Sequence, residues 1–216
     1  MRIAILGTGA VGRRLAEGFN SLGHEVMLTA RSADNGEAAD WARAFGGRSG
    51  SFAGGAEWCE LAVVAVRGEH AVSAVGMAGP GALTGKIVVD VTNPLDFSRG
   101  FPPFLTDGMN NTTSVGEAVQ AALPGSSVVK TLNTVSNLLM TEPGRVAGPH
   151  DLFICGNDAA AKARVAGLLA EFGWGAPIDL GGIEAARATE AWLLLWTRLY
   201  GALGTADFNL RLVRND

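Results

Sequence analysis

Several residue types are scarce in this 216-residue chain, and each scarcity excludes a class of protein. The two cysteines, Cys59 and Cys155, have neither CxxC spacing nor a histidine cluster, which argues against a disulfide scaffold and a zinc site. The net charge of −4 argues against non-specific nucleic-acid binding. The apolar run at 191–196 falls far short of the roughly 20 residues that span a bilayer. We therefore expect a cytoplasmic globular protein with no nucleic-acid or membrane partner and no bound metal.

Groups that could donate a proton to a substrate are scarce as well. Tyr200 is the only tyrosine, and it has no lysine in Tyr-xxx-Lys spacing. We expect His24 in a turn after the first helix, away from the cleft, and His150 at the surface. His70 is expected near a bound ligand, as a ligand contact rather than a proton donor. No residue is therefore predicted to be a catalytic acid. This favours direct hydride transfer between two ring cofactors, where the protein supplies mainly proximity and orientation.

Apolar residues and glycine are abundant, and they follow an α/β pattern. Hydrophobic residues make up 48% of the chain, enough for a sizeable core. Short apolar runs alternate with segments of helical periodicity, which indicates βαβ units and a parallel sheet. We predict a Rossmann-like, doubly wound, mainly parallel sheet in residues 1–134 and a small C-terminal α/β domain in 135–216 that closes the substrate cleft. Strands are expected at 2–6, 25–29, 48–52, 61–66, 86–91, 127–132, 151–155, 176–180 and 208–213, and helices at 10–22, 37–45, 69–77, 115–123, 159–172 and 183–203.

Residues 7–12, GTGAVG, form a GxGxxG motif between the first expected strand and the first expected helix. This is the context in which the motif binds a dinucleotide. Gly7 would permit the tight turn, Gly9 the approach of the backbone to a pyrophosphate, and Gly12 the close packing of helix on strand. The helix N-terminus would offer free N–H groups and a partial positive charge to the phosphates. We predict a dinucleotide site here, the alternative being a glycine turn without a ligand.

The end of the second expected strand indicates which dinucleotide binds. An NAD site usually has a carboxylate there, about 20 residues after the motif, to bind the ribose 2′-hydroxyl. Here Ala30, Arg31 and Ser32 stand at the tip, and the first carboxylate, Asp34, comes later. Arg31 offers a charged planar fork to a 2′-phosphate, and Ser32 offers a hydroxyl. We predict NADP(H) as the cofactor, the alternative being that Arg31 is a solvated loop charge.

Three further strand ends should line the rest of the site, because ligands of open α/β sheets lie outside the carboxyl ends of the strands. Pro94 would pack on the nicotinamide ring, and Asn93 and Asn133 would hydrogen-bond its carboxamide or the partner ring. The alternative is that Asn93-Pro94 only starts a turn. The three ends are Val66-Arg67 with His70 just after, Asn93-Pro94, and residues 130–134.

The segment 93–113 is rich in Pro, Gly, Asp and Asn, with no expected helix or strand of its own. Structureless loops of this length are uncommon inside compact domains and are often functional lids. We predict a lid over the substrate cleft, the alternative being a disordered excursion.

Seven segments together resemble one family. They are similar to the NADPH-dependent reductases of the 5-deazaflavin coenzyme F420, a group that includes the cytosolic oxidoreductase domain of membrane ferric reductases. The resemblance covers essentially the whole chain. Its segments are GTGAVG (7–12), TARS (29–32), VVDVTNPL (88–95), VVKTLNTV (128–135), FICGND (153–158), DLGGIEAARATE (179–190) and GTADFNLRLVR (204–214).

The resemblance also implies roles for particular residues. Asn133 departs from the family, whose members often carry His at this position, and Leu132 stands where they often carry Phe. Archaeal members also have a second basic residue near Asn35. The substrate pocket would be walled by Leu95, Asn133, Thr134, Leu203 and Gly204. The resemblance implies that the cofactor contacts Thr8, Gly9, Ala10 and Val11 at the pyrophosphate, Arg31 and Ser32 at the 2′-phosphate, and Val66, Arg67, Asn93 and Pro94 along the ribose and nicotinamide. The motif and the strand ends add Gly7, Gly12, Ala30 and His70 to the predicted cofactor site.

The implied activity is hydride transfer between NADPH and a deazaflavin (F420) or flavin-like acceptor, with F420 as co-substrate. The resemblance also implies a homodimer with the C-terminal helices between the subunits, and the apolar segment 191–196 suits that position. Burial of this segment within one subunit is the alternative. Two other functions remain open: reduction of a small imine or carbonyl compound, and regulation by non-catalytic NADP(H) binding.

Overall fold

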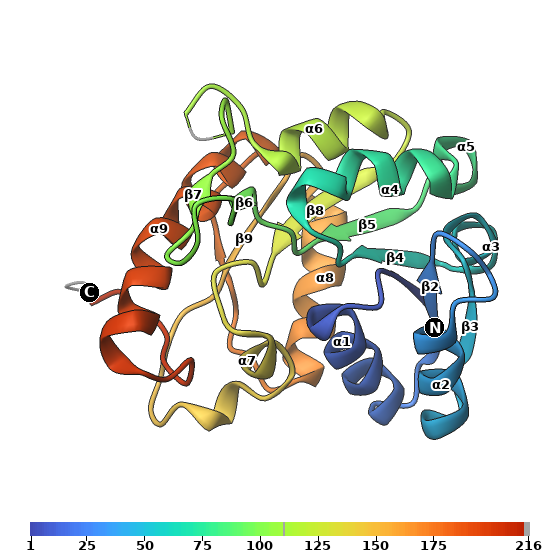
Figure 1. The fold of residues 1–216 in the computed structure, drawn as a ribbon, viewed down its shortest axis with the longest axis horizontal. Coiled ribbons are helices and arrows are strands. Elements are labelled where there is room, and N and C mark those ends of the chain that lie inside the picture. The colour runs from blue at the N-terminus through green and yellow to red at the C-terminus, as the bar shows by residue number, and fades with distance from the viewer. Residues whose placement is uncertain (110, 214–216) are drawn as a thin grey trace.

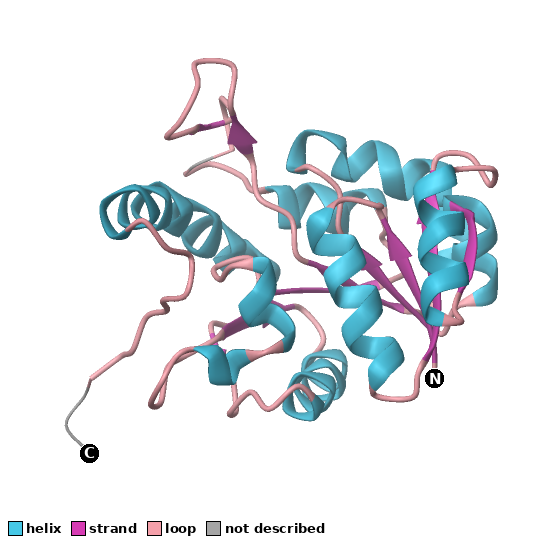
Figure 2. Cartoon of the chain, turned by 60° about the horizontal axis from the view of Figure 1, so that its bottom comes forward, coloured by secondary structure: helices cyan, strands magenta, loops and turns pink. Residues whose placement is uncertain are grey.

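The computed structural model describes residues 1–109 and 111–213, so Asn110 in the expected lid and Arg214 in the last family segment lie outside the described residues. A mainly parallel sheet runs through the molecule, with helices on both of its faces (Figures 1 and 2). Among the described residues it has eight strands, in the order β10-β9-β8-β5-β4-β1-β2-β3. These are β1 Arg2–Leu6, β2 Glu25–Ala30, β3 Arg48–Ser51, β4 Leu61–Val64, β5 Ile87–Asp90, β8 Ser127–Thr131, β9 Phe153–Gly156 and β10 Ile178–Asp179.

The chain reverses its winding direction at β1, which has β2 on one side and β4 on the other. This is the Rossmann arrangement, and its switch point lies between the carboxyl ends of β1 and β4. Strand β9 pairs antiparallel with β8, and β10 pairs parallel with β9. Residues after 135 therefore extend the same sheet, while their division into a separate cleft-closing domain stays a prediction.

Alternation along β1 divides its side chains between two cores. Ile3 and Ile5 pack under α1, α2, α7 and α8, whereas Ala4 and Leu6 pack under α3 to α6. A longer helix, α9, stands at the side of the sheet opposite α2 and α3 (Figure 1). The helices are α1 Ala10–Ser21, α2 Gly36–Phe45, α3 Phe52–Trp58, α4 Ala71–Ala78, α5 Pro80–Leu83, α6 Val115–Ala122, α7 Asn137–Thr141, α8 Ala159–Glu171 and α9 Ala186–Leu203, with 3₁₀ turns at Gly68–His70, Pro143–Arg145 and Ile183–Ala185.

Two of the predicted segments differ in the structure. The segment 93–113 contains a small hairpin, β6 (Leu95–Asp96) with β7 (Phe104–Leu105), held at its base because Thr106 donates its N–H to the Pro94 carbonyl at 2.8 Å. The strand expected at 208–213 was wrong: the sheet ends at β10, and the alternating residues find no strand to pair with among the described residues. The segment is held instead by hydrogen bonds to Asp151, whose N–H donates to the Leu210 carbonyl at 2.9 Å and whose carbonyl accepts the Asn209 side-chain amide at 2.9 Å.

Within residues 1–109 and 111–213, we find no helix whose length and apolar character would suit a membrane crossing.

Candidate functional site

A trough runs along the carboxyl ends of β1, β2, β4 and β5. It consists of adjoining hollows of about 450, 300 and 210 Å³. Val66, just after β4, lines all of them, so the hollows form one continuous depression. The largest hollow joins the glycine loop to Asn93, and the other two meet at Arg31. The depression lies at the switch point of the sheet, where open α/β folds bind their ligands.

The glycines after β1 shape the middle of the trough. Gly7 has a φ of +125°, and a Cβ there would lie 2.5 Å from the Ala65 carbonyl oxygen. A Cβ on Gly12 would lie 2.0 Å from the Gly7 carbonyl oxygen, so the close approach is chiefly to the loop and less to β1. A Cβ on Gly9 would meet no described atom within 4 Å, although Gly9 lines the trough. The fold thus requires Gly7 and Gly12, while the space beside Gly9 is left for a ligand.

Helix α1 begins beside this space with its N-terminus uncapped. Gly9 is the N-cap, and in the described part of the chain no side chain accepts a hydrogen bond there and no acidic residue occupies the first turn. The first N–H groups of the helix and its partial positive charge are therefore free for an anion. Thr8 directs its hydroxyl to Glu37 at 2.9 Å, outside the loop. These features fit a pyrophosphate.

Arg31 follows β2 and lines the two smaller hollows. Among the described residues, no hydrogen bond or ion pair engages its guanidinium, whereas Arg43 on the neighbouring helix pairs with Asp40. The Ser32 hydroxyl donates to Asp34 and holds the pKa of that carboxyl below its usual value. A partner-free guanidinium facing a hollow beside the glycine loop fits a ribose 2′-phosphate.

The other end of the trough is built on a pair of asparagines. Asn93 donates its side-chain amide to the Asn133 carbonyl at 2.8 Å, and Asn133 donates its own amide to Asn93 Oδ1 at 2.9 Å. Leu132, just before, has a φ of +61°, a left-handed conformation that is costly for a branched residue. A Cβ on Gly68 would lie 2.2 Å from the Asn93 carbonyl oxygen. This glycine therefore allows the loop after β4 to pack against the loop after β5. Both amides are thus held in place before any ligand arrives.

The structure brings most of the predicted site residues together. Pro94 is buried behind the hollow, and Asn133 is only 2% exposed. Thr134 lines a separate apolar pocket of about 240 Å³ against Trp192, and Leu203 and Gly204 lie at the exposed far end of α9. Gly12 allows the loop at Gly7 to pack closely against α1 and does not itself line the hollows. The predicted residues that do line the trough are Gly7, Thr8, Gly9, Ala10, Val11, Ala30, Arg31, Ser32, Val66, Arg67, His70, Asn93 and Leu95.

Some lining residues did not follow from the sequence. Phe52 begins α3, a helix that its internal glycines obscure, and faces Arg31 across the smallest hollow. Ser73 and Met77 on α4 line the same hollow and are one helical turn apart, a spacing that could have indicated a shared face. Phe97 comes from the hairpin segment and lines the largest hollow, so part of the expected lid borders the trough.

The side chains in this trough suit binding and orientation more than proton transfer. Arg67 and His70 line the largest hollow, and both side chains are largely exposed. Glu69 lies 3.0 Å from the Arg67 guanidinium and 3.7 Å from the His70 ring. No carboxylate, tyrosine or lysine lines the trough among the described residues.

The comparisons with known proteins agree with this geometry. The model of the family NADP oxidoreductase coenzyme F420-dependent matches residues 2–94. An F420-dependent NADP reductase of Methanocaldococcus jannaschii is 34% identical over 113 residues, which are 50% of this chain and 48% of that protein. The match thus spans about half the length of this curated relative.

Solved structures extend the likeness to the whole chain. A candidate F420-dependent NADP-reductase from Arthrobacter sp. FB24 is 46% identical, with a TM-score of 0.93 over 99% of this chain and 100% of that chain. A reductive aminase from Aspergillus terreus in complex with NADPH and ethyl levulinate is 19% identical, with a TM-score of 0.66 over 94% of this chain and 62% of that one. At that identity the likeness concerns the fold alone.

Proposed function

The chain belongs to the F420-dependent NADP oxidoreductase family, and from this premise we propose that it transfers hydride between NADPH and a deazaflavin such as coenzyme F420, or a flavin-like acceptor. The observation that carries the proposal is the continuous trough from Arg31, past the glycine loop, to the paired asparagines. One dinucleotide phosphorylated on its ribose would fill all three hollows. The acceptor rests on the names of the relatives and on the character of the site.

The residues that would hold the nucleotide can be assigned from their positions. Arg31 and Ser32 would bind the 2′-phosphate, with Phe52 and Met77 against the adenine. Gly9 and the uncapped start of α1 would receive the pyrophosphate. When bound, the cofactor supplies the hydride.

Asn93 would orient the nicotinamide end through its amide, which Asn133 holds from behind. Leu95 and Phe97 border the same hollow and would limit the access of water to it. Two rings held in contact need no acid at the carbon that receives hydride, because the acceptor ring can take its proton from solvent. This accounts for a site built on amides and backbone.

Turnover tests the proposal directly. We expect the protein to oxidise NADPH with oxidised F420 as acceptor, with loss of the deazaflavin's visible absorption at a rate proportional to enzyme, and free FMN as a parallel acceptor. Rapid turnover with FMN alone would reassign the acceptor to a flavin. Tight NADPH binding without turnover of either acceptor would contradict the proposed activity and favour a non-catalytic NADP(H)-binding protein.

We also propose that the protein is a homodimer that pairs through α9. Leu194, Leu195 and Leu203 on this helix are 45%, 51% and 56% exposed, which leaves three large apolar side chains open to a partner surface. Sedimentation equilibrium should give twice the mass of one chain. Leu195→Glu should shift the protein toward monomer, whereas Arg43→Glu on the distant α2 should not. A monomer at micromolar concentration would contradict this arrangement.

A further inference from the structure

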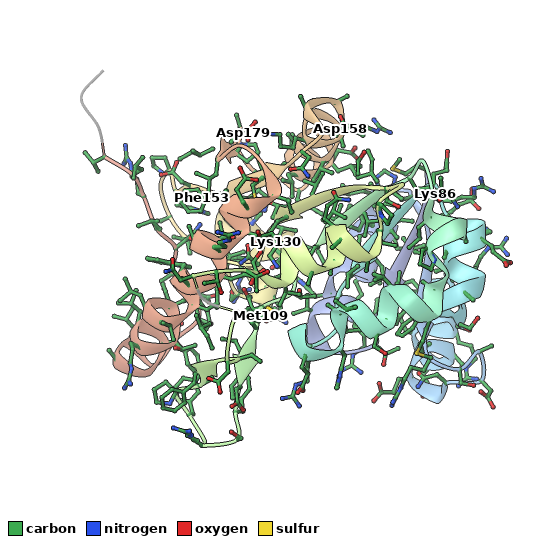
Figure 3. All side chains as sticks on the ribbon, turned by 90° about the horizontal axis from the view of Figure 1, so that it is seen from above. Lys86, Met109, Lys130, Phe153, Asp158 and Asp179 are labelled. Atoms are coloured by element: carbon green, nitrogen blue, oxygen red, sulfur yellow. The ribbon has the colours of Figure 1, made fainter. Side chains whose placement is uncertain are left out.

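Three charged side chains are buried together behind the asparagine pair. Lys130 on β8, Asp90 at the end of β5 and Glu190 on α9 all have side chains that are 0% exposed. The Lys130 ammonium donates to Asp90 Oδ2 at 2.9 Å and lies 2.8 Å from Glu190 Oε1. Figure 3 labels Lys130 in the interior, near α6 and α9. Burying ions costs several kcal/mol each, and well-packed apolar residues often serve stability equally well. Fold stability alone thus does not account for this cluster.

The cluster is fully hydrogen-bonded although its charges do not cancel. One ammonium and two carboxylates leave a formal charge of −1. Glu190 accepts the N–H groups of Val115 at 2.9 Å and Gly116 at 3.0 Å, at the positive end of α6. Burial raises the pKa of Glu190, while the two carboxylates outweigh burial and raise the pKa of Lys130. Burial also raises the pKa of the nearby Cys155 thiol to about 12, so that group adds no charge.

The contacts of the cluster converge on the residue before Asn93. Lys130 donates to the Thr92 carbonyl at 2.6 Å, and Asp90 Oδ1 accepts both the N–H of Thr92 at 2.9 Å and its hydroxyl at 2.7 Å. Every hydrogen-bonding group of Thr92 is therefore held by the cluster. Asn93 is the next residue in the chain, and it lines the trough.

The same cluster also restrains the chain segment that leads to Asn133. Lys130 lies two residues before Leu132, whose left-handed backbone is unfavourable for a side chain of this size. Such a conformation persists only where the surrounding structure over-determines it. Fixing Lys130 from two sides, β5 and α9, supplies that restraint at the start of the turn. Asn133 follows Leu132 and reaches Asn93 because of this turn.

We propose that Asp90, Lys130 and Glu190 are positioning residues: from behind, they hold the Asn93–Asn133 pair in the geometry that hydride transfer needs, and they tie that geometry to α9. None of them lines the trough, so each acts through Thr92 and Leu132. The inference rests on the proposed function, because the pair matters only if a ring lies against it. It assigns a role in catalysis to α9, although none of the described residues of that helix lines the trough.

The test compares Glu190→Gln with a matched control on the same helix. This substitution keeps the size of the side chain but turns an amide toward the N–H groups of α6 and removes one negative charge from beside Lys130. We expect kcat with NADPH and deazaflavin to fall at least tenfold, with the NADPH dissociation constant within threefold of wild type. Thr197→Val removes a buried hydroxyl that donates to Leu193 at 2.9 Å, and it should leave kcat unchanged. Asp90→Asn, which leaves Lys130 and Glu190 as an oppositely charged pair, makes the same test if the Glu190→Gln variant does not fold.

A second measurement separates this inference from the proposed acceptor. Hydrogen–deuterium exchange should quicken in residues 91–95 and 131–135 of Glu190→Gln and remain unchanged in residues 27–32 at the end of β2. If the wild type does not reduce deazaflavin, the proposed acceptor fails while the exchange pattern still decides the inference. Unchanged exchange in both segments, with kcat within twofold of wild type, would overturn it. So would a loss of melting temperature with full activity in the folded protein, because that marks a merely structural cluster.

Discussion

Replacing Arg31 with alanine is expected to raise the NADPH dissociation constant by about 10- to 100-fold and to leave that of NADH within about twofold. The two cofactors differ only in the 2′-phosphate, and hydrogen bonds to a charged group contribute about 1.5–3 kcal/mol. Arg31 has no protein partner among the described residues, so its removal breaks no contact of the fold. Fluorescence titration with each cofactor measures both constants.

Arg43→Ala provides the matched control, because Arg43 is an exposed arginine on α2 that lines none of the hollows. It should change neither constant. Raising the salt concentration to about 1 M should narrow the preference for NADPH in the wild type, since the Debye length then falls to about 3 Å. Equal losses for NADPH and NADH in the Arg31 variant would contradict the assignment of the 2′-phosphate site.

Gly9→Ala is expected to separate binding from folding. A Cβ at this position meets no described atom, and the φ of −67° is ordinary for alanine, so the melting temperature should change little. The added methyl would occupy the space proposed for the pyrophosphate. Overpacking of this kind costs about 1–3 kcal/mol, which predicts a loss of affinity of about 5- to 150-fold for NADPH and NADH alike. Calorimetric titration and thermal unfolding measure the two effects.

Two other glycine variants serve as comparisons for Gly9→Ala. Gly12→Ala should lower stability and affinity together, because its Cβ would lie 2.0 Å from the Gly7 carbonyl oxygen. Gly76→Ala, in α4 and open on its outer side, should bind NADPH like the wild type. Full affinity in a folded Gly9→Ala protein would place the pyrophosphate elsewhere.

The glycine loop, helix α1 and the end of β2 could be predicted from local sequence. Residues 1–22 combine a buried strand, the three glycines of the motif and an amphipathic helix, and each signal is complete in its own stretch of chain. The end of β2 is also local, and Arg31 lies where the pattern placed it. The mainly parallel sheet followed from the alternation of strands and helices, and it was confirmed.

The parts that were missed depend on contacts between distant segments. Helix α3 contains Gly54 and Gly55, poor helix formers, and Gly55 is there because a Cβ would lie 2.6 Å from Thr29. The strand expected at 208–213 had a suitable pattern but no neighbour to pair with among the described residues. Lys130 gave no sign of its partners in the sequence, because Asp90 and Glu190 are 40 and 60 residues away.

In the proposed reaction, hydride passes directly from the nicotinamide to a second ring held in the same site. A single turnover with NADPH deuterated at the transferred position of nicotinamide C4 tests this transfer, with F420 as acceptor and mass spectrometry of both products. We expect deuterium on C5 of the reduced deazaflavin, carried over stoichiometrically and not diluted by solvent protons. Deuterium lost to water, or a reduced deazaflavin without label, would contradict direct transfer and require a relay group that this site does not show among its described residues.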